Sequence, residues 1–178
     1  MFKEYLLSNK KNGTPVSLYS DREHTEKFSF GFIQGISNDH VLLACISPLG
    51  LYDGFMIVNY KGIYQCEIQD QYSEKLLKLY HLRKQKHPVL DIKSDNLILD
   101  LIQYAQENRL IISAGLHDSG NDDLQGYVTT VEDGLVTIEQ LSDDGSPDGE
   151  SVVSFEDITY IVCDSDNEIA LKLLAENP

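Results

Sequence analysis

The stretch SFGFIQGISNDHVLLACISPLGLYDGFMIVNY, residues 29–60, decides the fold, because a second part of the chain follows the same pattern. That part is LQGYVTTVEDGLVTIEQLSDDGSPDGESVVSF, residues 124–155, and it aligns without a gap at an offset of 95 residues. Glycines, an Asp-Gly pair and alternating apolar residues coincide in this one frame, which predicts two copies of one structural unit. The identical pairs are Gly31/Gly126, Val41/Val136, Ser47/Ser142, Gly50/Gly145, Asp53/Asp148, Gly54/Gly149 and, outside these stretches, Leu6/Leu101, Ile63/Ile158, Leu76/Leu171 and Leu79/Leu174.

The residue pattern of each copy predicts a helix followed by five short strands. The first helix covers Phe2–Leu7 and ends at Asn12-Gly13, and the second begins after an N-cap at Ser94 or Asp95 and runs to Asn108. Alternating apolar residues bounded by Gly, Asp and Asn predict the strands. The clearest predicted strands are Val16–Tyr19, the alternating residues from Phe28 to Ile33 and Val41–Cys45 in the first copy, and Leu110–Ser113, Gly126–Val131, Leu135–Leu141, Glu150–Phe155 and Ile158–Cys163 in the second.

Five short strands are too few for a two-sheet sandwich, but they can curl into a small bent barrel with glycines at the bends. We therefore predict a mainly β fold with two tandem SH3-like five-stranded barrels, each preceded by an α-helix. Leucines such as Leu76 and Leu171 close each copy, and we expect them to pack across an open barrel end or between the barrels. The predicted domains are a first barrel at 1–80, a basic connector at 81–93 and an acidic barrel at 94–178.

Composition excludes several classes of protein. The chain has 178 residues, of which 42% are hydrophobic, so it can bury a core and is neither disordered nor collagen-like. Its longest apolar runs, such as Val41–Ile46, are far too short to span a membrane. No apolar segment of a signal peptide follows Met1-Phe2-Lys3-Glu4, and the three cysteines are scattered. We expect a cytoplasmic protein with reduced thiols.

The charge is divided unevenly between the copies. Twenty-nine acidic and fourteen basic residues give a net charge of −15, which argues against indiscriminate binding to phosphate backbones. Residues 1–95 nevertheless carry twelve of the basic residues against eleven acidic ones, whereas residues 96–178 carry two against eighteen. The first copy also holds seven of the ten tyrosines. We therefore expect the second copy to have a strongly acidic surface and the first copy a nearly neutral one that is richer in tyrosine.

The order of one helix and a bent five-stranded barrel resembles the Sm-like (LSm) proteins. Gly31-Phe-Ile-Gln-Gly-Ile36 resembles the start of the first motif of that family, and Asn59-Tyr60-Lys61-Gly62-Ile63 resembles its second motif. The resemblance covers most of both copies and implies a protein that binds single-stranded RNA. In the family an acidic residue and an Asn after strand two form the uridine pocket together with an Arg-Gly after strand four.

The chain departs from this pattern in ways that bear on RNA binding. The first turn reads Ser37-Asn38-Asp39-His40-Val41, with Val41 or a neighbour at the place of the motif Asn. Lys61 stands where Arg is expected and lacks the planar guanidinium that clamps a base. If either copy binds RNA, the first one does. The tentative RNA-binding residues are Asn38, His40, Tyr60, Lys61 and Gly62, with Arg83, Lys84 and Lys86 of the connector.

The alternative function is a protein–protein adaptor. The acidic second copy suits a basic partner, including a nucleic-acid-binding one, and its tentative contact residues are Asp143, Asp144, Glu156 and Asp157. The basic connector could instead pair with this acidic copy. The run 143–150 lacks the ligand spacing of an EF-hand and is explained equally well by a turn.

Catalytic chemistry has little support in the sequence. The five histidines are scattered, no phosphate-binding glycine loop follows a strand, and no nucleophile motif is present. We expect no enzyme activity, no cofactor and no metal, and the sequence does not set the oligomeric state.

Overall fold

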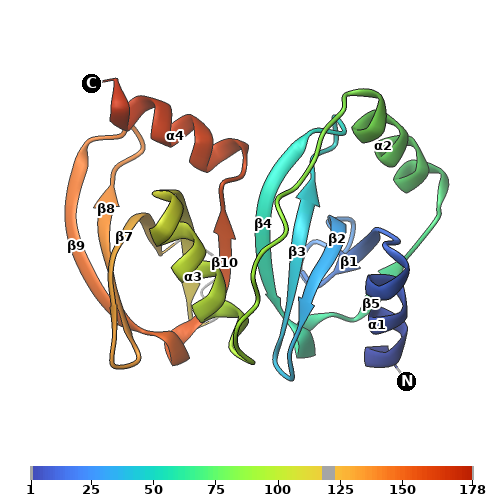
Figure 1. Cartoon of the computed structure of the whole chain (residues 1–178), viewed down its shortest axis with the longest axis horizontal. Helices are drawn as coiled ribbons and strands as arrows, with labels where there is room; N and C mark the ends of the chain where they lie inside the picture. The colour runs from blue at the N-terminus through green and yellow to red at the C-terminus, as the bar shows by residue number, and fades with distance from the viewer. Residues whose placement is uncertain (1, 118–122, 178) are drawn as a thin grey trace. The chain divides into compact units, whose positions relative to one another are not determined.

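The computed structural model describes residues 2–117 and 123–177. The chain divides into two compact units, Met1–Leu90 and Asp91–Pro178. The first unit thus includes residues 81–90, for which a connector is predicted. Each unit contributes its own strands and helices (Figure 1).

The first unit is an antiparallel sheet with a helix at each end of its chain (Figure 1). Its strands lie in the order β5-β1-β2-β3-β4. A single-turn 3-10 helix, η1, separates β4 from β5. The elements are α1 (Phe2–Asn12), β1 (Val16–Tyr19), β2 (Ser29–Ile36), β3 (His40–Ile46), β4 (Tyr52–Asn59), η1 (Tyr60–Gly62), β5 (Gln65–Glu67) and α2 (Gln71–Leu82).

The second unit repeats these elements in the same order. Its strands lie in the order β10-β6-β7-β8-β9, with the 3-10 helix η2 before the last strand of the chain. The two 3-10 helices begin 95 residues apart, as do the two C-terminal helices. The elements are α3 (Leu97–Asn108), β6 (Ile111–Leu116), β7 (Leu124–Glu132), β8 (Leu135–Leu141), β9 (Pro147–Ser154), η2 (Phe155–Asp157), β10 (Ile158–Cys163) and α4 (Asp166–Glu176).

The expected mainly β class is confirmed, but closed barrels do not form. Among the described residues, β5 and β4 do not pair within the first unit, nor do β10 and β9 within the second. Closing a sheet requires its two edges to pair along their length, and β5 offers only the three residues Gln65–Glu67, which pair with β1. Each unit is therefore an open, curved sheet.

Helices α2 and α4 complete the cores, and the sequence analysis missed both as helices. Leu76 and Tyr80 of α2 pack with Phe30 and Ile46 of the sheet. In the second unit, Leu171 of α4 is likewise buried. The closing leucines therefore belong to helices that cover the sheet. A smaller correction concerns α3, whose N-cap is Asn96 rather than Ser94 or Asp95: the Asn96 side chain accepts a hydrogen bond from Leu99 N at 3.2 Å.

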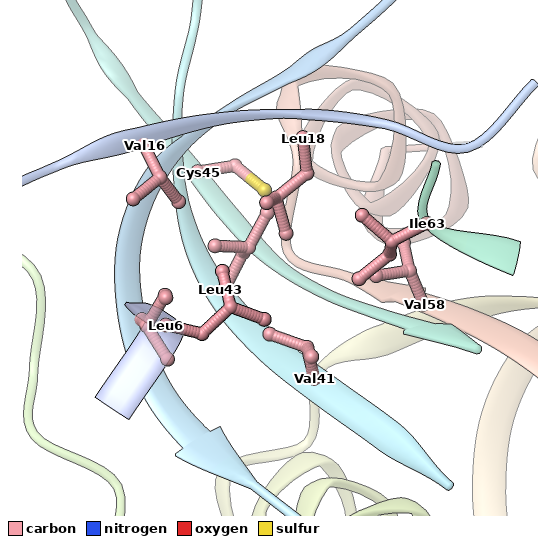
Figure 2. Packing of buried hydrophobic residues seen from close by; sticks show 9 residues of the cluster. Leu6, Val16, Leu18, Val41, Leu43, Cys45, Val58 and Ile63 are labelled. Atoms are coloured by element: carbon pink, nitrogen blue, oxygen red, sulfur yellow. The ribbon is translucent and has the colours of Figure 1, made fainter. Parts of the chain in front are cut away.

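The main core of the first unit lies inside the curve of the sheet, as Figure 2 shows. Side chains at alternate positions of β3 point into it, as period-two alternation requires. Leu6 of α1 reaches the same cluster and is fully buried. The buried members are Leu6, Val16, Leu18, Ile33, Val41, Leu43, Cys45, Val58 and Ile63.

A repeated glycine lets each C-terminal helix approach the turn after the third strand of its unit. Gly50 has a φ of +68°, and a Cβ at this position would lie 2.4 Å from Leu79 Cβ. Gly145 has a φ of +84°, and a Cβ there would lie 2.5 Å from the backbone N of Ala175. Both the left-handed backbone and the close contact therefore require glycine. This explains why the turn keeps a glycine in both copies.

The N-terminus of each C-terminal helix holds a serine and an acid in exchanged positions. In α2 the N-cap is Asp70, which accepts from the Ser73 hydroxyl, and Ser73 Oγ lies 3.2 Å from Ser17 Oγ of β1. In α4 the N-cap is Ser165, whose hydroxyl donates to Glu168. Glu168 is buried and also accepts from Ser113 Oγ of β6 at 2.6 Å. Each arrangement ties the helix start to the first strand of its unit.

Candidate nucleic-acid interface of the first unit

Two segments that the sequence analysis singled out meet at one end of the first sheet. Asn38 lies in the turn between β2 and β3, and His40 begins β3. His40 lies opposite Asn59, the last residue of β4, and Tyr60–Gly62 follow as η1. The β3–β4 ladder therefore brings five predicted RNA-binding residues to one place.

A backbone hydrogen bond and an ion pair link the turn to η1. Tyr60 N donates to the Asp39 carbonyl oxygen at 2.7 Å. Lys61 Nζ lies 3.2 Å from Asp39 Oδ1, and the two side chains are 78% and 62% exposed. Water screens such an exposed pair, so its contribution to stability is small. An anionic ligand could draw Lys61 away from Asp39 at little cost.

Short polar side chains shape both segments. The Ser37 hydroxyl accepts hydrogen bonds from the backbone N–H of Asp39 at 3.3 Å and of His40 at 3.0 Å. Asn59 Oδ1 accepts from Lys61 N at 2.9 Å and so caps η1. Ser and Asn favour such local bonds to the backbone over regular strand pairing. The chain therefore turns at these positions.

Helix α1 adds two residues that the sequence analysis missed. Lys3 Nζ donates to Asn38 Oδ1 at 2.9 Å. The ring of Phe2 lies 6.2 Å from that of Tyr60, between ring centroids. Nothing in the sequence indicated either contact, because two strands and a long loop separate α1 from the turn. The site thus combines two ammonium groups with two aromatic rings.

His40 adds no positive charge to this end at neutral pH. Burial lowers the pKa of His40, and the nearby Asp39 only partly opposes this effect. The imidazole is therefore neutral at pH 7. Lys3 and Lys61 provide the positive charge near the turn.

The basic residues of the predicted connector lie elsewhere in the unit. Arg83 is the C-cap of α2, and Gln85 Oε1 accepts from Tyr52 N at the start of β4. Asn59 ends that strand, roughly 23 Å away at ~3.3 Å per residue. Helix α2 and the β2–β3 turn accordingly lie at opposite ends of β3 and β4 (Figure 1). Arg83, Lys84 and Lys86 therefore do not join Lys61 in one surface.

In the second unit the corresponding end is acidic. Phe155 N donates to the Gly134 carbonyl oxygen at 3.1 Å, so η2 again meets the turn between the second and third strands. His117 Nε2 lies 3.7 Å from Asp157 Oδ1 at the same end. This geometry offers carboxylates where the first unit offers amide and ammonium groups. The positions that correspond to Asn38, Lys61 and Gly62 are Asp133, Glu156 and Asp157.

The four predicted partner-binding residues also fall into two groups. Glu156 and Asp157 lie in η2, next to Ser154 of β9, whereas Asp143 and Asp144 lie in the turn before the other end of that strand. The Ser142 hydroxyl donates to Asp144 at 2.7 Å, and this bond is the main reason that the pKa of Asp144 is lowered to about 2. A turn thus accounts for Asp144.

Residues 83–90 are attached to the first unit by His87. Its ring stacks on that of Tyr80 at 5.6 Å and lies 4.6 Å from that of Tyr52. Tyr80 Oη lies 2.8 Å from His87 Nδ1, within hydrogen-bond distance. Gln34 of β2 fastens the next residues, since its amide donates to the Pro88 carbonyl at 3.2 Å. This part of the predicted connector is packed against the sheet.

We expect the first unit to lose stability as the solution is acidified below about pH 6.5. Burial lowers the pKa of His87 from its usual value of 6.5, so the unfolded chain binds this proton more readily than the folded one. The stabilising effect of the neutral ring is complete above about pH 6.5 and is lost as the pH falls toward the lowered pKa. Urea unfolding monitored between pH 7.5 and pH 5, by circular dichroism, measures this loss.

The variant His87→Phe keeps a ring between Tyr52 and Tyr80 but cannot take up a proton. Its unfolding midpoint should change less between pH 7.5 and pH 5 than that of the original protein. His81→Phe, at an exposed position nearby, is the control. An unchanged pH profile in His87→Phe would contradict this role of His87.

Metal and thiol chemistry find no assembled site in the described residues. No cluster of three or more His, Cys, Asp or Glu side chains suited to a metal occurs in 2–117 and 123–177. The three cysteines are free, and burial raises the pKa of Cys66 to about 11.

Within residues 2–117 and 123–177, no helix has the length and apolar character needed to cross a membrane.

Comparison with protein-family models, with curated proteins and with solved structures finds no match for this chain.

Proposed function

We propose that this chain is a non-enzymatic, Sm-like binding protein that contacts single-stranded RNA through its first unit. The carrying observation is the convergence of Lys3 and Lys61 with the rings of Phe2 and Tyr60 around the β2–β3 turn. Ammonium groups neutralise phosphates, and aromatic rings stack on unpaired bases. The polar atoms of Asn38 lie beside them for contacts to a base or ribose.

The Sm-like part of the proposal rests on the leading helix and five antiparallel strands found in each unit. We regard each unit as a five-stranded unit of this kind that does not close into a barrel. Of the resembling motifs, the second forms η1 at Tyr60–Gly62, beside the β2–β3 turn, whereas the first, Gly31–Ile36, lies in β2, which leads into that turn. The second unit has carboxylates there, which repel phosphate, so RNA contact is proposed for the first unit alone.

Lys61→Glu should weaken binding of oligo-U or oligo-A RNA at least about tenfold, because it replaces a phosphate-neutralising group with a repelling one. Fluorescence anisotropy of labelled RNA, titrated with protein at low and moderate salt, measures this. Affinity of the original protein should fall with rising salt, in proportion to the few phosphates neutralised.

The matched control is Lys84→Glu, which makes the same charge change at the opposite end of the strands. It should leave RNA affinity within about twofold of the original, because a charge this distant is screened in moderate salt. Equal losses in both variants would mean that net charge alone governs binding. Absence of binding at tens of micromolar protein in low salt would refute the proposal.

A second candidate function is an adaptor for a basic protein, favoured by the acidic end of the second unit. Glu132 and Asp133 precede Gly134 in the β7–β8 hairpin, and Glu156 and Asp157 follow Phe155, whose N donates to the Gly134 carbonyl oxygen. Carboxylates gathered from two segments steer a basic partner, including a nucleic-acid-binding one. If RNA binding is absent, this end is the surface to present to such partners.

A further inference from the structure

A pocket of about 420 Å³ lies in the first unit between α2 and the adjoining ends of β2, β3 and β4. This volume is in the range of sites for small organic ligands. Its floor is part of the core, since Phe30, Ile46 and Leu76 are buried and pack together. Its walls include Phe28, Met56 and Tyr72.

Two aromatic rings form a corner of this pocket. Phe28 and Tyr72 lie 5.8 Å apart between centroids, and their planes are nearly perpendicular at 88°. Tyr72 is 42% exposed, so a large part of its apolar ring surface remains in contact with water and is not buried in the core. Perpendicular rings present both a face and an edge to a guest, and the negative face attracts cations.

The charged residues that line the pocket favour a positive guest. They are the carboxylates of Glu26 and Asp53 and the ammonium group of Lys27. Asp53, near the start of β4, and Cys45, near the end of β3, both line the pocket. An anionic ligand would face two carboxylates and only one ammonium group, so the charge of the lining disfavours it.

The second unit shows that the fold does not require this apolar lining. At the 95-residue offset the acid is kept as Asp148, but the apolar walls are replaced by polar residues. Gln140, in place of Cys45, donates to Ser151 Oγ at 2.9 Å. The apolar lining is therefore a feature of the first unit that the second unit does not share. The replacements at Phe28, Phe30, Met56 and Tyr72 are Asp123, Gln125, Ser151 and Asn167.

We propose that this pocket binds a small organic cation, an alkylated or quaternary ammonium group, held against Phe28 and Tyr72 and facing Asp53. A quaternary ammonium group has no hydrogen-bond donors to satisfy, so it tolerates apolar walls, and aromatic faces attract its charge. The proposal is independent of RNA contact, since the pocket lies at the α2 end of the strands and the β2–β3 turn at the other end.

Met56 provides a direct reporter, because the chain has two methionines, Met1 and Met56. Protein labelled with ¹³C at the methionine methyl groups would be titrated with choline and, separately, with its neutral isostere 3,3-dimethylbutan-1-ol. We expect a saturable shift of the Met56 signal with choline and about five- to tenfold weaker binding of the alcohol. Equal binding of both compounds, or no Met56 shift at roughly tens of millimolar choline, would overturn the proposal.

Tyr72→Asn, which installs the residue of the second unit, should weaken choline binding about fivefold or more, and Tyr72→Phe should retain it. Tyr5→Asn is the matched control, because Tyr5 is 41% exposed on α1 and does not line the pocket. Unaltered choline affinity in Tyr72→Asn would overturn the assignment. A third titration with Nα-acetyl-trimethyllysine amide, compared with choline, distinguishes a side chain of a protein from a free cation as the source of the ammonium group.

Discussion

Gly31→Ala should lower the unfolding free energy of the first unit by about 3 kcal/mol or more, one of the largest effects expected for any single methyl group. A Cβ at Gly31 would lie 2.1 Å from the carbonyl oxygen of Ala44 and 2.8 Å from its carbonyl carbon. Both contacts are with the backbone of β3, so no side-chain rotation relieves them. Gly31 also pairs with Cys45 in the β2–β3 ladder, and strand separation would sacrifice hydrogen bonds.

Urea unfolding followed by far-UV circular dichroism measures this effect. Gly62→Ala is the control in the same unit, because no heavy atom lies within 4 Å of a Cβ built there. Gly126→Ala should damage the second unit comparably, since its Cβ would lie 2.0 Å from the Glu139 carbonyl oxygen. If Gly31→Ala shifted the urea midpoint of unfolding as little as Gly62→Ala does, the close approach of β2 to the β3 backbone at Gly31 would be contradicted.

Glu168→Ser should destabilise the second unit by about 3 kcal/mol, because it removes a buried carboxylate that satisfies several donors. Glu168 accepts from Ser113 Oγ at 2.6 Å, from Ser165 N at 3.0 Å and from the Ser165 hydroxyl. Its loss leaves the start of α4 without these bonds and loosens its tie to β6. Glu150→Ser, at an exposed position of β9, controls for the loss of one negative charge.

The first unit supplies the rescue. The double variant Ser165→Asp/Glu168→Ser rebuilds the arrangement of Asp70 and Ser73, in which the acid caps the helix and the serine faces the first strand. It should recover at least about half of the stability lost in Glu168→Ser, as expected for two residues in direct contact. Urea unfolding of all three variants gives the coupling free energy. No recovery would show that the two helix starts are not equivalent.

Local patterns predicted most of the strands. Val16–Tyr19, Leu135–Leu141 and Ile158–Cys163 are strands with the predicted bounds. Apolar alternation is a property of neighbouring residues, and Gly, Asn and Asp mark turns through their own backbone preferences. These signals act over a few residues, so they can be recognised before the fold is known.

The sequence did not predict helices α2 and α4, because the buried face of each helix includes a polar residue. In α4 the buried residues are Glu168 and Leu171, while Leu173 and Leu174 are 60% and 48% exposed. A buried acid interrupts the hydrophobic period by which an amphipathic helix is recognised. Glu168 is acceptable inside only because Ser113, distant in the chain, donates to it.

The sequence predicted only part of each candidate site, because the missing parts depend on contacts between residues distant in the chain. Tyr60, Lys61 and the turn at Asn38 were singled out from sequence, but their contacts with Phe2 and Lys3 were not. The aromatic alternation at Phe28 and Phe30 predicted a strand without indicating a pocket. A pocket arises from the space left between elements, which a linear pattern does not describe.

By itself, the sequence determined the 95-residue repeat, the order of strands and turns and the contrast in charge between the copies, because these are properties of neighbouring residues and of composition. Only the tertiary structure decided that each five-stranded sheet stays open and that α2 covers a pocket. It also placed Arg83 and Lys61 at opposite ends of β4, and Asp143 and Glu156 at opposite ends of β9. Each of these outcomes depends on contacts between residues distant in the chain, and those contacts form only when the strands pair and the helices pack.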